Sequence, residues 1–289
     1  MADKSPKTLE ALVTSLPRTP KRLVQQEFTD MQVQIPGARP EDYALHKTSG
    51  STGQPTRVRK LITSYFIEYD AFTLLEWEWQ KRDINKVLGG FRIGEADIDD
   101  APAGPPLTYI GNPPSQFSRS SLDHTPAQLL DAMVELRGSY VYSNGVTIRL
   151  VALEQIRNPR PGVLLEQFLS VSDRVDESLR DLVNQAFGAK ICDRYSSEEF
   201  GYIALQCPVH NHLHVLSPSI YVEIVDENGQ ACDVGQPGKV LVTALHSFAQ
   251  PLIRYEIGDI AQWGEPCAAG ITWPVIENIM GRERQYLSG

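Results

Sequence analysis

The chain reads Thr48-Ser49-Gly50-Ser51-Thr52-Gly53-Gln54-Pro55-Thr56 between two segments, 43–47 and 58–63, that have the pattern of β-strands. Glycine lets the backbone bend so that N–H groups converge on an anion, and the hydroxyl groups add donors. A loop of this kind suits a triphosphate, although a mobile Ser/Gly turn has the same composition. It is not a Walker A loop, because it has no Gly-Lys-Ser/Thr end and a strand follows it instead of a helix.

The segments around this loop predict an α/β fold. The expected helices are 8–16, 65–83, 125–136 and 176–187; the expected strands are 43–47, 58–63, 190–195, 220–225, 239–245 and 257–263; residues 94–121 are expected to be mostly loop, with a short buried strand at 107–110. A helix followed by a strand in mid-chain favours an α/β architecture. After about residue 215 the pattern contains only strands, which predicts an antiparallel β-rich lobe.

Composition and charge exclude several classes of protein. The 289 residues are 42% hydrophobic and 22% charged, no apolar run approaches the roughly 18 residues of a membrane span, and residues 1–7 do not begin a secretory signal. The net charge of −9 argues against general nucleic-acid binding, which needs a basic surface. Four cysteines are too few and too scattered for a disulfide scaffold. These observations predict a soluble, cytoplasmic protein that binds neither nucleic acid nor membrane.

Three further stretches follow the glycine-rich loop: Asp193-Arg194-Tyr195-Ser196-Ser197-Glu198-Glu199-Phe200-Gly201, Ile253-Arg254-Tyr255-Glu256-Ile257-Gly258-Asp259 and Met280-Gly281-Arg282-Glu283-Arg284. In this order the four stretches resemble motifs of the adenylate-forming (AMP-binding) superfamily, and the Pro-Thr end of the first loop is similar to the phenylacetate–CoA ligase branch. The resemblance implies the large N-terminal domain of that family, a layered α/β/α fold. Its expected parts are α/β lobes over 1–215, a β-rich lobe over 216–280 and a hinge remnant at 281–289. The family's small C-terminal domain is expected to be absent from the 289 residues.

The resemblance implies roles for residues at the matching positions. It makes Glu198, helped by Ser197, the catalytic group that holds Mg²⁺, a hard cation that carboxylates bind well. The implied ATP-binding residues are Thr48, Ser49, Gly50, Ser51, Thr52, Gly53, Ser172, Asp173, Tyr195, Asp259 and Arg282, with Tyr195 on the adenine and Asp259 on the ribose. Tyr142 and Asn144 fall where the family places part of its carboxylate pocket. Helix capping explains Ser172, Asp173 or Ser197 as well, and a core or turn position explains Tyr142 and Asn144.

Cysteine and histidine gather in Cys207-Pro208-Val209-His210-Asn211-His212-Leu213-His214, with Cys267 further along the chain. Thiolate and imidazole are the ligands that tetrahedral Zn²⁺ prefers, so Cys207, His210, His214 and Cys267 form a candidate set, with His212 as a substitute. The resemblance implies a structural metal, since some members of the phenylacetate–CoA ligase branch carry one on such residues, but Ala269 stands in place of one cysteine here. A structural zinc site and a degraded site with a free cysteine and surface histidines both stay open.

The function that the resemblance implies is ATP-dependent adenylation of a carboxylic acid, aryl or arylacetic. The acyl-AMP then passes to CoA, a carrier-protein thiol or an amine, with ATP and Mg²⁺ as cofactors; a homodimer is left open. The family's C-terminal domain supplies a lysine, so we expect weak turnover but retained ATP or AMP binding from these 289 residues alone. Departures from the expected patterns favour the alternative, a non-catalytic nucleotide-binding or scaffold protein on the same fold; they lie at Ser196, Glu256, Ile257, Arg284 and Ala269.

Overall fold

The structure of the chain is a computed structural model, which describes residues 8–48, 55–93, 97–102, 107, 115–171 and 175–283. The chain forms two compact units: Met1–Tyr69 with Ser196–Gly289, and Asp70–Tyr195. The sequence places boundaries at 215 and 280 instead. The difference arises because residues 194–215 form strands of the same sheet as the later strands, and because the chain returns to the first unit after its middle third.

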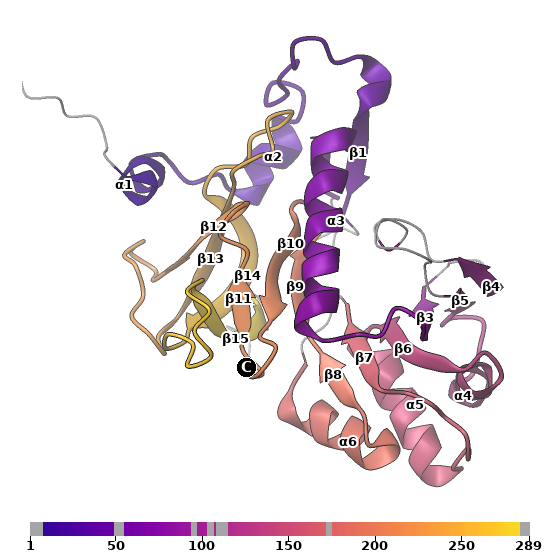
Figure 1. The fold of residues 1–289 in the computed structure, drawn as a ribbon. Helices are drawn as coiled ribbons and strands as arrows, with labels where there is room; N and C mark the ends of the chain where they lie inside the picture. The colour runs from indigo at the N-terminus through magenta and orange to yellow at the C-terminus, as the bar shows by residue number, and fades with distance from the viewer. Residues whose placement is uncertain are drawn as a thin grey trace, which may run out of the picture. The chain divides into compact units, whose positions relative to one another are not determined.

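The first unit contains a seven-stranded sheet with the order β12-β13-β14-β15-β11-β10-β9 (Figure 1). Its strands are β9 (Arg194–Ser197), which begins at the unit boundary, β10 (Gly201–Gln206), β11 (Leu213–Val215), β12 (Ile220–Val225), β13 (Pro237–Ala244), β14 (Tyr255–Trp263) and β15 (Val275–Arg282). The neighbouring pairs from β12 through β15 to β11 and β10 are antiparallel, as the β-rich pattern predicts. Strand β15 was not expected. It places Gly281 and Arg282, assigned to a hinge from the sequence, at the end of a central strand.

Shorter elements complete the first unit. They are α1 (Leu9–Thr14), α2 (Lys21–Gln26), a single 3₁₀ turn (Pro40–Asp42), β1 (Tyr43–Lys47), β2 (Arg57–Leu61) and the start of α3 (Ile62–Trp79). Strands β1 and β2 form an antiparallel ribbon in which Lys47 is opposite Arg57, so the glycine-rich stretch connects two paired strand ends. This ribbon confirms the strand–loop–strand pattern read from the sequence. The helix expected at 65–83 begins three residues earlier and ends at Trp79.

The second unit contains a six-stranded sheet with the order β4-β5-β3-β6-β7-β8. Its elements are β3 (Val87–Arg92), β4 (Ile98–Pro102), β5 (Ser115–Ser120), α4 (Pro126–Glu135), β6 (Gly138–Ser143), α5 (Gly145–Arg157), β7 (Gln167–Ser170), α6 (Glu177–Phe187) and β8 (Lys190–Cys192). Strands β5, β3, β6, β7 and β8 are parallel, and β4 pairs antiparallel at one edge. The expected loop at 94–121 therefore contains two strands, and the expected strand 190–195 is divided at Asp193. Leu107 is buried, while 108–110 lie outside the described residues.

Side chains on the two faces of this sheet pack against different helices. Val141 and Phe168 belong to a buried cluster with residues of α4, α5 and α6, whereas the next positions on the other face, Tyr140 and Leu169, pack with Trp77 of α3. This alternation is the period-two pattern of a strand that is covered on both sides. The unit is thus a layered α/β/α arrangement, which confirms the expected fold class.

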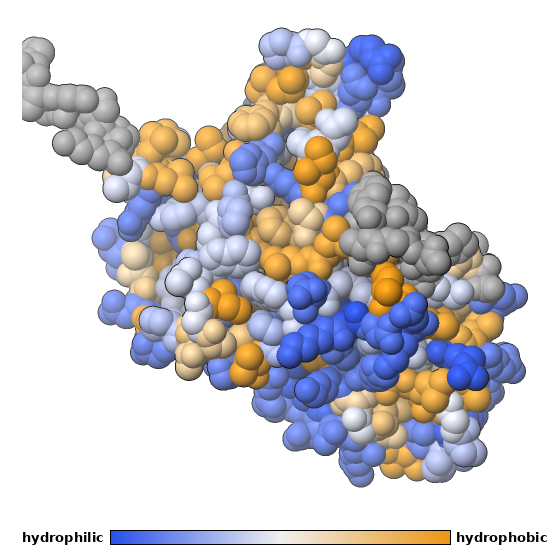
Figure 2. Space-filling model, viewed as in Figure 1, coloured by the Kyte–Doolittle hydropathy of each residue, from blue (hydrophilic) through white to orange (hydrophobic). Residues whose placement is uncertain are grey.

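Helix boundaries in this unit follow local sequence signals. Thr125 caps α4 in a capping box with Gln128, Pro126 occupies the first helical position, and Gly188 ends α6 in the left-handed conformation. Within the described residues, no helix is both long and apolar enough to cross a membrane. On the face drawn in Figure 2, hydrophobic and hydrophilic residues are interspersed.

Candidate functional site

The two ends of the glycine-rich stretch are bonded to each other. Thr48 N–H donates to the Thr56 carbonyl (3.0 Å), and Thr56 N–H donates to the Thr48 hydroxyl (2.9 Å). Gln25 of α2 donates its side-chain amide to the Thr56 hydroxyl (3.3 Å). Ser49, Gly50, Ser51, Thr52 and Gly53 lie outside the described residues. The base of this stretch is therefore fixed by these backbone and side-chain hydrogen bonds and by the β1–β2 register.

The two adjacent glutamates of the second motif have opposite environments. The Glu198 side chain is 61% exposed, and its Oε2 lies 3.5 Å from His46 Nδ1. The Glu199 side chain is 4% exposed, accepts a hydrogen bond from the Tyr255 hydroxyl (3.0 Å) and pairs with the Lys21 ammonium (3.5 Å). Glu199 is thus committed to internal contacts, while the Glu198 carboxylate is available to an exogenous cation. The Ser197 hydroxyl accepts a hydrogen bond from Phe200 N–H (3.2 Å), which supports the turn that presents Glu198.

Asp259 and Arg282, assigned from separate motifs, lie side by side. They are register partners on β14 and β15, and Arg282 Nε lies 3.2 Å from an Asp259 carboxylate oxygen. A second Arg282 nitrogen donates to the Ile257 carbonyl (2.8 Å). Asp259 is 7% exposed, whereas the Arg282 side chain is 48% exposed. Their proximity agrees with the sequence assignment of both residues to one nucleotide, and their roles stay predictions.

The remaining predicted ATP contacts lie in or next to the second unit. Tyr195 is buried on β9, directly after Arg194, whose guanidinium pairs with the buried Glu76 carboxylate (3.1 Å). Ser172 and Asp173 lie outside the described residues. The cap of the following helix is Asp176, which accepts from Leu179 N–H (2.8 Å), so capping of α6 does not require either residue.

Tyr142 and Asn144, the expected carboxylate-pocket residues, lie at the end of β6 and at the start of α5. Tyr142 is half-buried, and the Arg92 guanidinium lies 5.4 Å from its ring centroid. Asn144 caps α5 by accepting from Thr147 N–H (2.8 Å). The turn interpretation therefore accounts for Asn144, and its role in a pocket stays a prediction.

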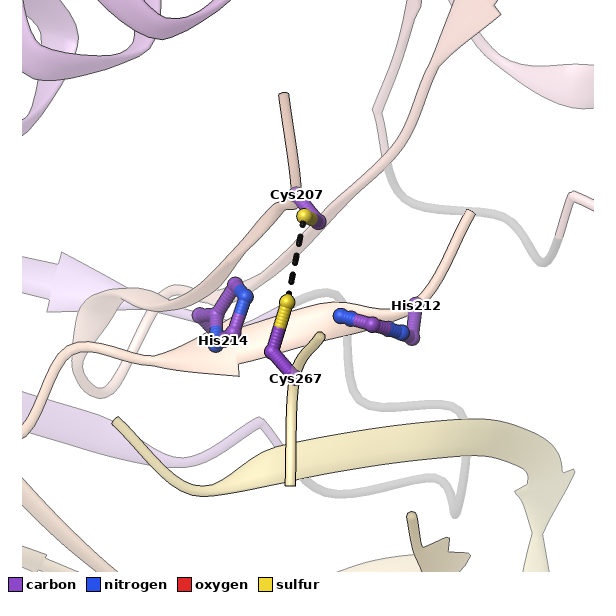
Figure 3. A group of neighbouring side chains, drawn as sticks. All are labelled: Cys207, His212, His214 and Cys267. Carbon is purple, nitrogen blue, oxygen red and sulfur yellow. Dashed lines mark hydrogen bonds between the residues drawn. The ribbon is translucent and has the colours of Figure 1, made fainter. Parts of the chain in front are cut away.

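Two cysteines and two histidines converge in the first unit (Figure 3). One candidate ligand atom from each of Cys207, His212, His214 and Cys267 lies within 4.8 Å of all the others. The expected His210 is not in this group, and His212 takes its place. The reason is local: Cys207 N–H donates to the His212 carbonyl (2.9 Å), which brings His212 back beside Cys207 and leaves His210 inside the turn between them.

The geometry of this Cys–His group fits tetrahedral zinc. The two Sγ atoms are 3.8 Å apart, and two thiolates on one tetrahedral Zn²⁺, each at about 2.3 Å, would be separated by about this distance. His214 Nδ1 donates to the Trp273 carbonyl (3.2 Å), which fixes the tautomer with its lone pair on Nε2. Burial also lowers the pKa of His212 and of His214, which favours the neutral imidazole that binds metal.

Several residues that lie near Glu198 were not predicted from the sequence motifs. Lys60, His46 and Glu199 lie close to Glu198, yet none belongs to a motif position with an assigned role. For Lys60, the one local indication is its position on the inward-facing side of the predicted strand 58–63. The contacts of Glu199 with Lys21 and Tyr255 join positions far apart in the chain and have no local signature.

Comparisons with known proteins identify the fold. No protein-family model matches the chain, and no curated protein matches it. Among solved structures, it is similar to 2-hydroxyisobutyryl-CoA ligase in complex with 2-HIB-AMP and CoA, with a TM-score of 0.77, 18% identity, and coverage of 96% of this chain and 66% of that one. It is also similar to the anthranilate CoA ligase AuaEII in complex with anthranoyl-AMP (TM-score 0.62, 15% identity, 86% of this chain and 49% of that one).

A third similar structure is the amide bond synthetase McbA from Marinactinospora thermotolerans, with a TM-score of 0.57, 17% identity, and coverage of 87% of this chain and 52% of that one. At these identities the likeness establishes the fold alone. The chain therefore has the fold of these enzymes and spans 66% of the first of them and about half of the other two.

Proposed function

We propose that the chain is an adenylate-forming ligase that binds MgATP and activates a carboxylic acid as its acyl-AMP. The observation that carries the proposal is the contact between His46 and Glu198, residues 152 positions apart. His46 stands two residues before Thr48, so this contact holds the exposed Glu198 carboxylate beside the base of the glycine-rich stretch. A carboxylate next to a predicted phosphate-binding loop is the arrangement that a Mg²⁺–polyphosphate complex needs.

Each residue has a distinct part in the proposed reaction. Glu198 holds Mg²⁺, which when bound neutralises phosphate charge, and Ser197 supports the turn that presents the carboxylate. Tyr195 lies against the adenine, and Asp259, which pairs with Arg282, accepts from the ribose hydroxyls. The substrate carboxylate attacks the α-phosphate in line and pyrophosphate leaves. The thiol of CoA or of a carrier protein, or an amine, then attacks the acyl carbonyl of the acyl-AMP, and AMP leaves.

The finer assignments belong to the same proposal. The Pro-Thr end of the glycine-rich stretch supports the phenylacetate–CoA ligase-like branch and an aryl or arylacetic acid substrate. The solved structures with this fold include one with anthranoyl-AMP and one with 2-HIB-AMP, so they support an acyl-AMP and leave the acid to experiment. A structural zinc on Cys207, His212, His214 and Cys267 stabilises the β10–β11 turn against the loop that carries Cys267.

The test of the proposal is ATP–pyrophosphate exchange with a panel of aryl, arylacetic and short aliphatic acids, beside calorimetric titration with MgATP. We expect MgATP binding by the 289-residue chain and pyrophosphate exchange that depends on the acid supplied. Glu198→Gln keeps the side-chain size and removes the charge, so it should abolish Mg²⁺-dependent binding and exchange. The matched control Glu227→Gln changes an exposed glutamate on the β12–β13 turn and should have no effect. A wild-type chain that binds no ATP would refute the proposal.

A second candidate function is a non-catalytic nucleotide-binding or scaffold protein on the same fold. It is favoured by Glu256, which replaces an expected arginine and lies 4.0 Å from Arg18, a surface contact unrelated to a nucleotide. A scaffold should bind ATP without exchange for any acid, and its binding of a partner should be indifferent to Glu198→Gln.

A further inference from the structure

Lys60 is a buried lysine that the proposed reaction does not use. It lies on β2 opposite Ala44 of β1 and is 5% exposed. Its Nζ lies 3.9 Å from the centroid of the Tyr65 ring, and none of the described residues offers this nitrogen a hydrogen-bond acceptor. Lysine is almost never fully buried without a partner, because its ammonium loses its hydration. An apolar side chain of the same length would fill this space at lower cost.

The surroundings of Lys60 connect it to the acidic pair. The Tyr65 ring also meets the His46 ring edge-on, with centroids 4.7 Å apart, and His46 contacts Glu198. The carboxylates that act on Lys60 are those of Glu198, Glu199 and Glu68, the last on α3. Burial lowers the pKa of Lys60 to about 7, and the three carboxylates oppose that shift.

We propose that Lys60 is a positioning residue that balances the charge of the Glu198–Glu199 pair from behind. An ammonium near carboxylates weakens their attraction for a free cation and also weakens their repulsion of an anion. With the ammonium in place, the site therefore holds a free divalent cation less tightly and accepts a polyphosphate more readily than it would without it. Since Nζ is buried, Lys60 acts through its field on Glu198 and not by contact with the ligand. The inference rests on the proposed function, because it takes Glu198 as the cation ligand.

The experiment compares Lys60→Met, which removes the charge, with Lys60→Arg, which makes it permanent. The probes are Mn²⁺ alone, followed by electron paramagnetic resonance, and ATP with EDTA, followed by calorimetry. We expect Lys60→Met to bind Mn²⁺ about tenfold more tightly and metal-free ATP about tenfold more weakly than the wild type. Lys60→Arg should shift both affinities the other way. Lys190→Met, at an exposed lysine of the second unit, is the control and should change neither.

The reciprocal pattern separates charge balance from structural damage. A packing defect would weaken both affinities in both variants, and that result, like no change in either variant, overturns the role of Lys60 while leaving the proposed function intact. If the wild type binds neither probe nor MnATP, the proposed function fails and this inference fails with it. Should Lys60→Met not fold, Lys60→Gln takes its place, since tighter Mn²⁺ binding together with weaker ATP binding is expected only from loss of the charge.

Discussion

Arg254 offers a quantitative test of how the first unit is held together. Its guanidinium makes two hydrogen bonds to the Glu223 carboxylate (3.1 and 3.0 Å) and two to backbone carbonyls, those of Leu16 (2.7 Å) and Thr14 (3.2 Å). Arg254 and Glu223 are each 8% exposed. One side chain therefore connects β12 to the end of α1 and the residues that follow it, and we choose Arg254→Met as the perturbation.

The expected loss follows from what the substitution leaves behind. Methionine fills much of the space but leaves the Glu223 carboxylate buried without its cation, and it leaves two carbonyls without their donor. Breaking a buried ion pair on one side costs about 3–5 kcal/mol, mostly as the penalty of the remaining charge. Replacing both partners removes that penalty, so Arg254→Met combined with Glu223→Leu should recover most of the loss.

The assay is urea unfolding followed by tryptophan fluorescence and far-UV circular dichroism. Arg254→Met should lower the free energy of unfolding by about 3–5 kcal/mol, and the double variant should lie within about 2 kcal/mol of the wild type. Limited trypsin cleavage at Arg18 should accelerate in the single variant, because the 14–19 segment loses its anchor. A single variant within about 1 kcal/mol of the wild type, or a double variant no better than the single one, refutes the reasoning.

Two further predictions concern zinc and pH. Purified protein should contain close to one zinc per chain by plasma mass spectrometry. His212→Ala should lose the metal and His210→Ala should keep it. The reverse pattern would favour the ligand set expected from the sequence, which contains His210. Burial raises the pKa of Asp193 from 3.8 to about 7, so the folded state holds the proton more tightly than the unfolded state, and stability is lost as pH rises from about 4 through 7. Asparagine at position 193 stays neutral, so Asp193→Asn should raise the free energy of unfolding at pH 8 by at most about 4 kcal/mol and change it little at pH 4. Equal effects at both pH values would contradict the raised pKa of Asp193.

Local sequence signals were sufficient where a single segment determines its own structure. The capping box at Thr125 and the apolar stripe of 176–187 gave helices with nearly the expected bounds, and the alternation around the glycine-rich stretch gave the β1–β2 ribbon. Strand β15 was missed because the residues 275–282 combine buried Val and Ile with polar positions and end in Gly-Arg, which fits a motif as well as a strand. Its place between β14 and β11 depends on pairing with β11, which lies much earlier in the chain than the adjacent strand β14.

The metal ligands show a similar limit. The sequence offered three histidines at alternate positions, 210, 212 and 214, which a continuous strand would place on one face. Strand β11 begins only at Leu213, and the turn closed by the Cys207–His212 backbone bond decides which two histidines meet the cysteines. No spacing rule distinguishes His210 from His212 before that turn is known.

The choice between Glu198 and Glu199 also depends on distant residues, and it determines what the site can do. Both carboxylates follow the same strand, so the motif alone allows either to hold a cation. Lys21 and Tyr255 hold the Glu199 carboxylate in the interior. Burial raises the pKa of Tyr255, so its hydroxyl stays protonated and donates to Glu199. Glu198 is left exposed, and its carboxylate contacts the His46 imidazole. A fixed internal carboxylate beside an exposed one gives the site a rigid support and a single cation ligand, which is why we expect Glu198→Gln to abolish Mg²⁺-dependent chemistry while leaving the fold unchanged.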